Sequence, residues 1–351
     1  MMEIDKLLRE NIRRFQPYSS ARDEFSGKEG TFLDANENSL GSVSDSNVNR
    51  YPDPHQKLLK TKLAALKQVK PEQIFLGNGS DEAIDLLIRA FCRPGRDRIV
   101  VMPPTYGMYR VCADLNDAAV VEVPLDSDFQ IDLAALDPYF TSETKLIFIC
   151  SPNNPSGNVM KADMIREVLG RTKGVVVVDE AYIDFAGVTT WLREIEKYDN
   201  LVVLQTFSKA WGMAGLRLGM AYANIEITAV MNKIKYPYNV NQITQELAVT
   251  ALDHVDKKNR YVDELVAERK FLEDNLSRMR LVKKIFPSES NFLLVRFDNP
   301  RDVYEALLDK NIIVRDRSTI SQCAGCLRIT VGTPADNKIL IKTLIQMDEQ
   351  K

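Results

Sequence analysis

One lysine in the chain is surrounded by groups that bind anions. Lys209 follows the apolar run Leu-Val-Val-Leu at 201–204, and Thr206 and Ser208 stand between that run and the lysine. Arg217 lies eight residues further on. Hydroxyl groups and a guanidinium bind phosphate oxygens, and an unprotonated lysine amine can attach covalently to a carbonyl carbon. These residue types therefore predict a site for an anionic ligand that the lysine holds covalently.

A second apolar run ends in a carboxylate. Residues 175–178 are four consecutive valines, and Asp179 follows them. Two fully apolar, β-branched runs are typical of central strands in a parallel sheet that is buried on both faces. Ligands of such sheets bind at the carboxyl ends of the strands. Asp179 and Lys209 are therefore expected in one crevice, where a carboxylate, two hydroxyls, a lysine and an arginine suit pyridoxal phosphate.

Strands and helices alternate through the middle of the chain, which predicts a large α/β domain with a doubly wound, mostly parallel sheet. Further strands are expected at 99–102, 119–122 and 146–149, and at 219–223 in either direction. Helices are expected at 56–67, at 83–91, from 106, near 133 and at 164–169. Between 151 and 157, two prolines and a glycine predict a rigid loop that holds Asn154 still.

Helical periodicity dominates from 241 to about 279, which predicts a long helix leading to a second domain. That domain is expected to be a smaller α+β unit, with short strands at 292–295, 312–314 and 326–330 and helices near Tyr304 and Ile339. We therefore divide the chain into an N-terminal arm with a substrate-lining loop (1–45), a large ligand-binding domain (46–250) and a small C-terminal domain (251–351). The first 30 residues are polar and weakly patterned, so we expect them to pack late or against a partner subunit.

Composition excludes several kinds of partner. The chain has 351 residues, of which 45% are hydrophobic, enough to bury a large core. Its net charge of −3 comes from interspersed acidic and basic residues, so neither nucleic acid nor an anionic membrane is expected as a partner. No apolar run is long enough to span a bilayer, and the N-terminus is too charged for a signal peptide. We therefore expect a cytoplasmic protein.

The cysteines do not indicate a metal site. Cys92, Cys112 and Cys150 lie in apolar segments, where reduced and packed thiols are expected. Cys323 and Cys326 form a lone Cys-x-x-Cys pair, but zinc would need two more ligands, and the chain offers no second cysteine pair and only two histidines. No metal is expected, and a redox role for this pair is a minor alternative.

Ordered motifs along nearly the whole chain resemble the fold type I pyridoxal-phosphate aminotransferases. The motifs that carry this resemblance are Gly77-Asn-Gly-Ser-Asp-Glu82, Asn153-Asn-Pro-Ser-Gly157, Asp179-Glu-Ala-Tyr182 and Ser208-Lys-Ala-Trp-Gly-Met-Ala-Gly-Leu-Arg217. Within that class the sequence is most similar to the histidinol-phosphate aminotransferase family, through Asn36-Glu-Asn38, Arg50-Tyr-Pro52, Val314-Arg-Asp-Arg317 and Leu327-Arg-Ile-Thr-Val-Gly-Thr333. Each motif alone is weak, whereas the ordered set is strong.

The resemblance implies a role for each residue around the ring of pyridoxal 5'-phosphate. Lys209 would attach to the cofactor's aldehyde and, once the substrate displaces it, would carry the proton between substrate and cofactor. Asp179 would pair with the pyridine nitrogen and keep it protonated. Asn154 and Tyr182 would hydrogen-bond the ring oxygen, and Tyr106 would lie over the ring face. Lys209, Asp179 and Tyr182 are the residues expected to take part in catalysis.

The resemblance also implies how the cofactor's phosphate is held. The groups that would bind it are the backbone amides of Ser80 and Asp81, the hydroxyls of Thr206 and Ser208, and the guanidinium of Arg217. Tyr51 would reach the same phosphate from the neighbouring subunit. The implied assembly is a homodimer with shared active sites.

For the substrate, the resemblance implies a phosphate site in the small domain. Arg315 and Arg328, together with Tyr18 of the arm, would bind the phosphate of histidinol phosphate, and Asn36 would line the pocket. Arg317 is expected to be a surface charge. The implied reaction is amino transfer between histidinol phosphate or imidazole acetol phosphate and glutamate or 2-oxoglutarate, a step of histidine biosynthesis.

Plainer alternatives stand beside these assignments. Lys209 could be a solvated loop lysine, Asp179 a helix cap, Tyr106 and Tyr182 packed aromatics, and Tyr51 a turn residue. Among enzymes, an aromatic amino-acid aminotransferase or a threonine-phosphate decarboxylase would use the same lysine and aspartate. A non-catalytic sensor on this fold is disfavoured, because such regulators carry a fused DNA-binding module and the chain has neither room for one before residue 30 nor a basic stretch.

Overall fold

Side chains of the central strands alternate between two hydrophobic clusters, so the large sheet is covered on both faces. In β5 (Val175–Asp179), Val176 and Val178 belong to one cluster and Val175 and Val177 to the other, and all four are fully buried. Burying a valine side chain contributes roughly 1.5–3 kcal/mol relative to leaving it exposed. The run forms a strand because a period of two places both halves of it in a core.

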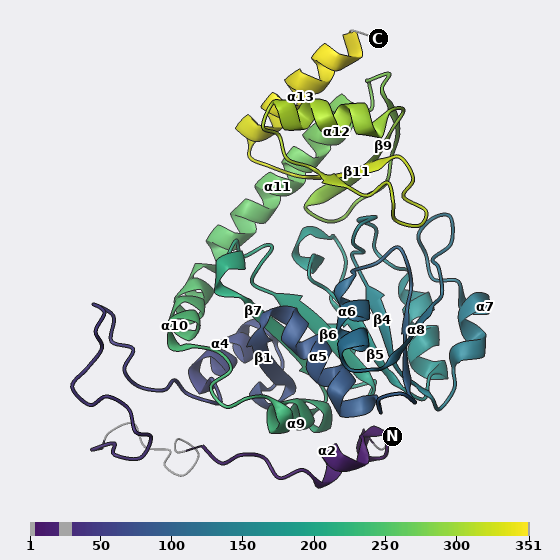
Figure 1. The fold of residues 1–351 in the computed structure, drawn as a ribbon. Helices are drawn as coiled ribbons and strands as arrows, with labels where there is room; N and C mark the ends of the chain where they lie inside the picture. Colours follow the sequence, from purple (N-terminus) through teal and green to yellow (C-terminus); the bar gives the residue numbers. More distant parts are fainter. Residues whose placement is uncertain (1–3, 21–29, 350–351) are drawn as a thin grey trace.

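The large sheet has seven strands in the order β1-β7-β6-β5-β4-β2-β3. It is seen in a computed structural model that describes residues 4–20 and 30–349 (Figure 1). The other strands are β1 (Ile74–Asn78), β2 (Arg98–Val101), β3 (Ala119–Glu122), β4 (Thr144–Cys150), β6 (Leu201–Thr206) and β7 (Leu218–Ala223). Strand β7 runs antiparallel to β1 and β6, whereas the remaining pairs are parallel. The predicted mostly parallel sheet is confirmed, and its strand at 219–223 is the antiparallel one.

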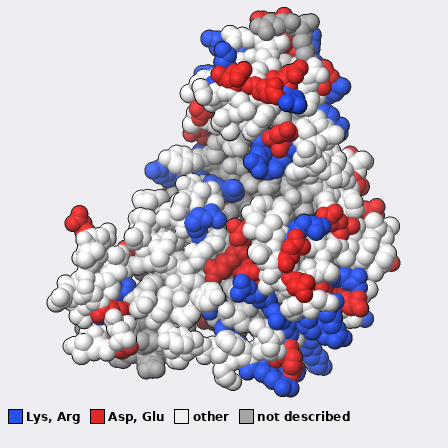
Figure 2. Space-filling view, viewed as in Figure 1, with Lys and Arg blue, Asp and Glu red and all other residues white. Residues whose placement is uncertain are grey.

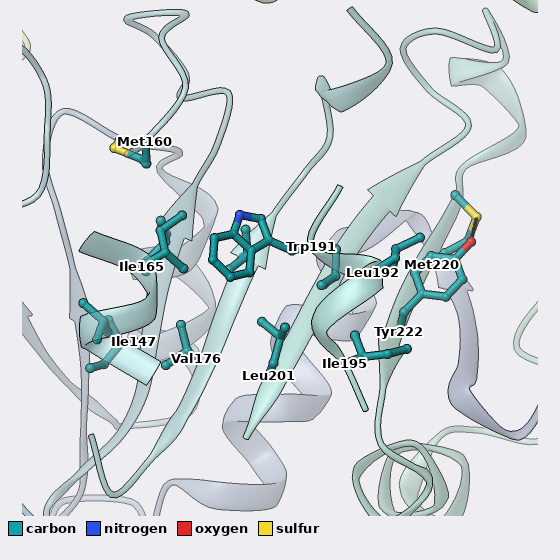
Figure 3. Close-up of a cluster of buried hydrophobic side chains, with 14 of the residues drawn as sticks. Ile147, Met160, Ile165, Val176, Trp191, Leu192, Ile195, Leu201, Met220 and Tyr222 are labelled. Atoms are coloured by element: carbon teal, nitrogen blue, oxygen red, sulfur yellow. Dashed lines mark hydrogen bonds between the residues drawn. The ribbon is translucent and has the colours of Figure 1, made fainter. Parts of the chain in front are cut away.

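Helices pack on both faces of this sheet. Helices α5, α6 and α9 contribute to the cluster on one face, and α4, α7, α8 and α10 to the cluster on the other. Part of the second cluster is drawn in Figure 3, where Ile165 of α8 joins Ile147 and Val176 of the strands. The bounds are α4 (Lys57–Lys67), α5 (Gly79–Phe91), α6 (Met108–Leu115), α7 (Leu133–Leu136), α8 (Ala162–Arg171), α9 (Ile225–Ile234) and α10 (Gln242–Ala251), with short 3-10 helices at Pro71–Gln73, Asp137–Tyr139, Ile183–Phe185, Trp191–Glu194, Ala214–Leu216 and Leu252–His254.

The first described residues pack on the large domain of their own chain. Helices α1 (Ile4–Leu7) and α2 (Glu10–Arg14) lie beside α5 and α9, and the Ile4 side chain is buried in the cluster of that face. The amide of Arg9 donates to the carbonyl oxygen of Ala90 at 3.0 Å. Leu7 and Leu8 border the same cluster, so three apolar side chains hold these short helices on the domain. Residues 21–29 of the predicted arm lie outside the described residues.

A four-stranded antiparallel sheet in the order β10-β11-β9-β8 forms the small domain. Its strands are β8 (Val282–Ile285), β9 (Phe292–Phe297), β10 (Arg315–Asp316) and β11 (Cys326–Thr330), and α12 (Pro300–Asp309) and α13 (Pro334–Glu349) share their core. The long helix α11 (Val255–Leu276) runs from the large domain to the small one (Figure 1). The boundary predicted at residue 250 falls in the last turn of α10.

One predicted strand of the small domain is wrong. The segment 312–314 has no partner strand, and pairing with β11 begins only at Arg315. Ile312 and Val314 pack against the core of the small domain, whereas Ile313 between them is 74% exposed. The alternation that predicted a strand therefore reflects an extended connection from α12 that buries one side.

The surface carries both signs of charge. On the face shown in Figure 2, acidic and basic side chains stand close together over both domains. In the part of the chain that the structure describes, no helix combines the length and the apolar composition that a membrane crossing requires. All five cysteines are free and buried, and burial raises the pKa of the Cys323 thiol to about 12. A thiol with that pKa is a poor nucleophile at neutral pH.

Candidate active site

Several polar side chains meet at one edge of the large sheet because the strands that carry them end there. Asp179 is the last residue of β5, and Thr206 is the last residue of β6. The parallel strand β4 ends at Cys150, and the loop with Asn154 follows it. Since β7 runs in the opposite direction, its first residues lie at this same edge, where Gly219 pairs with Thr206. The antiparallel strand therefore brings Arg217 to the site.

The start of α5 reaches the same edge through a close approach of two glycines. A Cβ atom on Gly219 of β7 would lie 2.1 Å from the backbone nitrogen of Ser80, so this position requires glycine. Gly79 has a φ of +71°, which glycine adopts without strain, and the chain turns there from β1 into α5. The amides of Ser80 and Asp81 belong to the first turn of α5, whose N–H groups have no partner within the helix. Such a helix start can bind an anion.

A cavity of about 560 Å³ lies between the two domains at this edge. Most of the predicted site residues line it together, namely Ser80, Asp81, Tyr106, Asn154, Asp179, Tyr182, Thr206, Ser208, Lys209, Arg217 and Arg328. The large domain supplies all of these side chains except Arg328, which comes from β11 of the small domain. These predicted residues bring a lysine, two carboxylates and two guanidinium groups into one hollow.

Asp179 is a buried carboxylate at the bottom of the sheet edge. Only 3% of Asp179 is exposed, and its Oδ2 accepts a hydrogen bond of 2.7 Å from the hydroxyl of Tyr109. Its Oδ1 accepts one of 3.1 Å from the amide of Ala181. Burial raises the pKa of this carboxyl, while the two hydrogen bonds act in the opposite direction. No basic side chain forms an ion pair with it among the described residues, so a cationic group in the cavity would be stabilised there.

Lys209 is half-buried in the cavity, and the pKa of its amine is lowered. Burial lowers the pKa of this amine, and the positive charge of Arg328 lowers it further. The negative charge of Asp179 acts against both. The Nζ atom lies 5.4 Å from the centre of the Tyr182 ring. The lowered pKa favours the neutral amine that nucleophilic attack and proton transfer require.

Asp81 connects two of the predicted cofactor contacts. Its Oδ1 accepts a hydrogen bond of 3.1 Å from the hydroxyl of Tyr106, and its Oδ2 lies 3.5 Å from Nη2 of Arg217. Arg217 itself has a φ of +52°, and its carbonyl oxygen accepts from the amide of Gly79. The side chain of Arg217 is 55% exposed and lines the cavity.

Arg328 crosses from the small domain to the large one. Its Nη1 donates to Oδ1 of Asn154 at 2.5 Å, and its guanidinium lies 5.2 Å from the centre of the Phe292 ring. The Tyr182 ring meets that same phenylalanine edge to face, at 5.2 Å between centroids. Burial lowers the pKa of Arg328. The two domains therefore contact each other through the residues that line the cavity.

Four predicted residues lie away from the cavity of their own chain. Tyr51 and Asn36 line a second hollow of about 530 Å³, where the Tyr51 ring stacks on Tyr238 with centroids 4.5 Å apart. Tyr18 is 73% exposed, and Arg315 on β10 is exposed as well. One chain by itself does not bring these four side chains to Lys209.

Known proteins are similar to this chain over most of its length. The family described as aminotransferase class I and II matches residues 24–344. The chain belongs to the class I and II aminotransferases. Among curated relatives of this aminotransferase, a histidinol-phosphate aminotransferase of Cytophaga hutchinsonii is 53% identical, over 97% of this chain and 98% of the relative.

Solved structures agree with that membership. The histidinol-phosphate aminotransferase of Clostridium acetobutylicum has a TM-score of 0.80 and 25% identity, and the match covers 87% of this chain and 92% of the other. The Sinorhizobium meliloti enzyme, solved in complex with pyridoxal-5'-phosphate, has a TM-score of 0.78 and 22% identity, over 90% of each chain. The family confirms the prediction of a pyridoxal-phosphate-dependent aminotransferase on this fold.

Two residues of the aminotransferase site were not found from the sequence. Arg317 lines the cavity, although we expected a surface charge there. Tyr109 is fully buried and holds Asp179, although only the helix that carries it was predicted. Arg315 and Arg317 follow the strand expected at 312–314, and a period of two along a continuation of it would have placed both on one face. Tyr109 lies three positions after Tyr106, which is one turn of the predicted helix.

Proposed function

We propose that this aminotransferase transfers an amino group between histidinol phosphate and 2-oxoglutarate, or in reverse from glutamate to imidazole acetol phosphate, in histidine biosynthesis. The observation that carries this proposal is the placement of Lys209 in a cavity lined by guanidinium groups of both domains, Arg217 of the large domain and Arg317 and Arg328 of the small one. One cationic group suits the phosphate of the cofactor. The guanidinium groups of the small domain are left for an anionic group of the substrate.

The groups around the cavity fit pyridoxal phosphate. The phosphate would be held by the amides of Ser80 and Asp81, the hydroxyls of Thr206 and Ser208, and Arg217. Asp179, buried and without a cationic partner among the described side chains, would hold the proton on the pyridine nitrogen. Asn154 and Tyr182 would hydrogen-bond the ring oxygen, and Tyr106 would cover the ring face.

When bound, pyridoxal phosphate supplies a carbonyl for covalent attachment and a ring that accepts electrons from the substrate's α-carbon. Lys209 would bind that carbonyl through Nζ, be displaced by the substrate's amine, and then take the α-proton at the same nitrogen. Its lowered pKa supports this role, because only the neutral amine accepts a proton. Arg328 would orient the substrate by binding the substrate's anionic group. It would then release the Asn154 oxygen to which it now donates, or share its donors between that oxygen and the substrate.

Substrate turnover by the holoenzyme tests the proposal directly. Histidinol phosphate with 2-oxoglutarate should yield glutamate, and phenylalanine should react at least about tenfold more slowly if the second anion site is built for phosphate. Faster reaction of phenylalanine would favour an aromatic amino-acid aminotransferase. Carbon dioxide release from threonine phosphate would identify a decarboxylase. Failure with all three would contradict the proposed substrates.

Arg315→Ala should weaken the reaction with histidinol phosphate by roughly tenfold in kcat/KM, with the loss in KM. We place Arg315 on the phosphate with Arg328, because these two residues pair directly across β10 and β11 and so share a face. Tyr18 and Asn36 complete the substrate pocket in this proposal. The reaction with phenylalanine should change little, since phenylalanine has no phosphate.

Lys283→Ala is the matched control for Arg315→Ala. Lys283 is an exposed cation of the small domain that pairs with Asp298, and it lies outside the cavity lining. The control should leave both reactions as in the wild type. Equal losses for phosphorylated and unphosphorylated substrates in Arg315→Ala would contradict a phosphate site at this position.

We also propose that the enzyme is a cytoplasmic homodimer whose sites are shared through Tyr51. Tyr51 is 52% exposed and lies outside the cavity of its own chain. Glu37, whose side chain is 3% exposed, accepts hydrogen bonds from the Tyr51 amide and from Arg50, so the loop that carries Tyr51 is held in place. An ordered but exposed aromatic suits contact with a second copy. The five free, buried cysteines suit a reducing compartment.

Mixing two inactive variants should restore activity if the sites are shared. A Tyr51→Ala subunit and a Lys209→Ala subunit would form hybrid dimers in which one site carries both defects and the other carries none. Random exchange should therefore recover about one quarter of wild-type activity. If Tyr51 served its own subunit, every site of the hybrid would carry a defect, and mixing would recover nothing.

A further inference from the structure

Arg317 lies on the same face of the small sheet as the two arginines proposed to bind substrate. Arg315 of β10 pairs directly with Arg328 of β11, and the two side chains therefore share a face. Arg317 is two positions beyond Arg315, and its amide donates to the carbonyl oxygen of Cys326 at 3.0 Å, so the pairing geometry continues to it. A period of two puts Arg317 on that face as well. Of these arginines, Arg317 and Arg328 line the cavity and Arg315 does not.

The guanidinium of Arg317 has unmet hydrogen-bonding capacity. Its Nε is buried and has no hydrogen-bond partner, and within residues 4–20 and 30–349 no carboxylate pairs with it. Burial lowers the pKa of Arg317, and the positive charges of Arg328 and Arg315 lower it further. A buried donor without a partner is costly, and like charges nearby add to that cost. An anion placed between the guanidinium groups would relieve both.

We infer that Arg317 binds the anionic group of the substrate together with Arg328, and that it gives the site its preference for a dianionic phosphate monoester over a monocarboxylate. This inference rests on the proposed function. A single guanidinium satisfies a carboxylate with two parallel hydrogen bonds, and Arg328 alone supplies that fork. A phosphate monoester carries nearly two negative charges and three acceptor oxygens, so it has capacity for a second fork. Arg317 is the cavity-lining group in position to supply it.

Arg317→Gln in the holoenzyme tests this role through the difference between substrates. The rate of amino transfer is measured with histidinol phosphate, with histidinol, which lacks the phosphate, and with phenylalanine. For histidinol phosphate, kcat/KM should fall roughly 10- to 100-fold, mainly through KM. For histidinol and phenylalanine the change should stay within about twofold, because neither carries a dianion. Arg317→Lys keeps the charge and loses the fork. Its kcat/KM with histidinol phosphate should therefore lie between the values of the wild type and the glutamine variant.

Arg301→Gln is the matched control, because it removes one positive charge from an exposed site on α12 that pairs with Glu305. It should behave as the wild type with all three substrates. An Arg317→Gln enzyme that loses activity equally on all three, with Arg317→Lys doing the same, would show a structural role and overturn the inference. A variant that matches the wild type with histidinol phosphate would overturn it too, while the proposed function would stand. A wild-type enzyme that does not react with histidinol phosphate would remove the proposed function, and the inference with it.

Discussion

Lys209→Ala is expected to reduce amino transfer by at least about 10³-fold, because the variant lacks both the amine that attaches to the cofactor and the base that moves the α-proton. General acid–base catalysis alone contributes about 10²- to 10⁴-fold. Lys209 is well placed for both tasks, since burial and the charge of Arg328 lower its pKa and so favour the neutral amine. Cofactor binding should survive in this variant, because Arg217 and the start of α5 remain.

Borohydride reduction gives a readout of Lys209 that does not depend on turnover. Reduction of the wild-type holoenzyme should fix the cofactor on the peptide that contains residue 209, and Lys209→Ala should yield no labelled peptide. Lys197→Ala is a suitable control, because Lys197 is an exposed lysine of the same domain that pairs with Glu194. A label on another lysine, or a Lys209→Ala enzyme with wild-type turnover, would refute the assignment.

The central part of the site could be predicted because strand ends are visible in the sequence. Four valines before Asp179, and the apolar run before Thr206, mark two buried strands whose carboxyl ends must meet at one edge. Lys209 follows the second run directly. Position in the sequence alone does not bring Arg217 to that edge, because its arrival there depends on β7 running antiparallel.

Elements without a run of β-branched residues were missed. Strand β1 (Ile74–Asn78) was not predicted, because it is short and ends in glycine and asparagine, which are typical of a turn. Helix α9 (Ile225–Ile234) was not predicted, although Asn224 caps it by accepting from the amide of Ile227. Strand β8 (Val282–Ile285) has two lysines at its centre because it is an edge strand of the small sheet. Its pattern resembles that of a loop.

Site residues at a distance were missed for a different reason. The contact between Tyr109 and Asp179 joins positions 70 residues apart, and no local pattern encodes it. Arg317 was taken for a surface charge because most arginines are exposed. The positions of Tyr51 and Asn36 outside the cavity fit the proposal that a second chain completes the site. These side chains depend on tertiary or quaternary contacts, which one sequence does not specify.

Asp179→Asn should lower kcat/KM by at least about 100-fold, an effect of the size seen when a buried electrostatic partner of a reacting group is removed. Asparagine keeps the shape of the side chain but has no charge to hold the proton on the pyridine nitrogen. The loss should lie in kcat, since the phosphate contacts are unchanged. A neutral ring would also alter the absorption spectrum of the bound cofactor, which can be followed without turnover. Wild-type kinetics and an unchanged spectrum would contradict the assignment.

Tyr109→Phe changes the pKa of Asp179 while the carboxyl group itself stays in place. The hydroxyl of Tyr109 donates to Asp179 at 2.7 Å and acts against the rise in pKa that burial causes. Removing the hydroxyl should therefore raise the pKa of Asp179 further. Activity that needs the ionised carboxylate is lost as the pH falls through that pKa, so the acid limb of the variant's kcat/KM profile should move to higher pH. Its activity should approach that of the wild type as the pH rises, whereas Asp179→Asn should stay impaired at every pH. A purely structural role for Tyr109 would lower the whole profile without moving its acid limb.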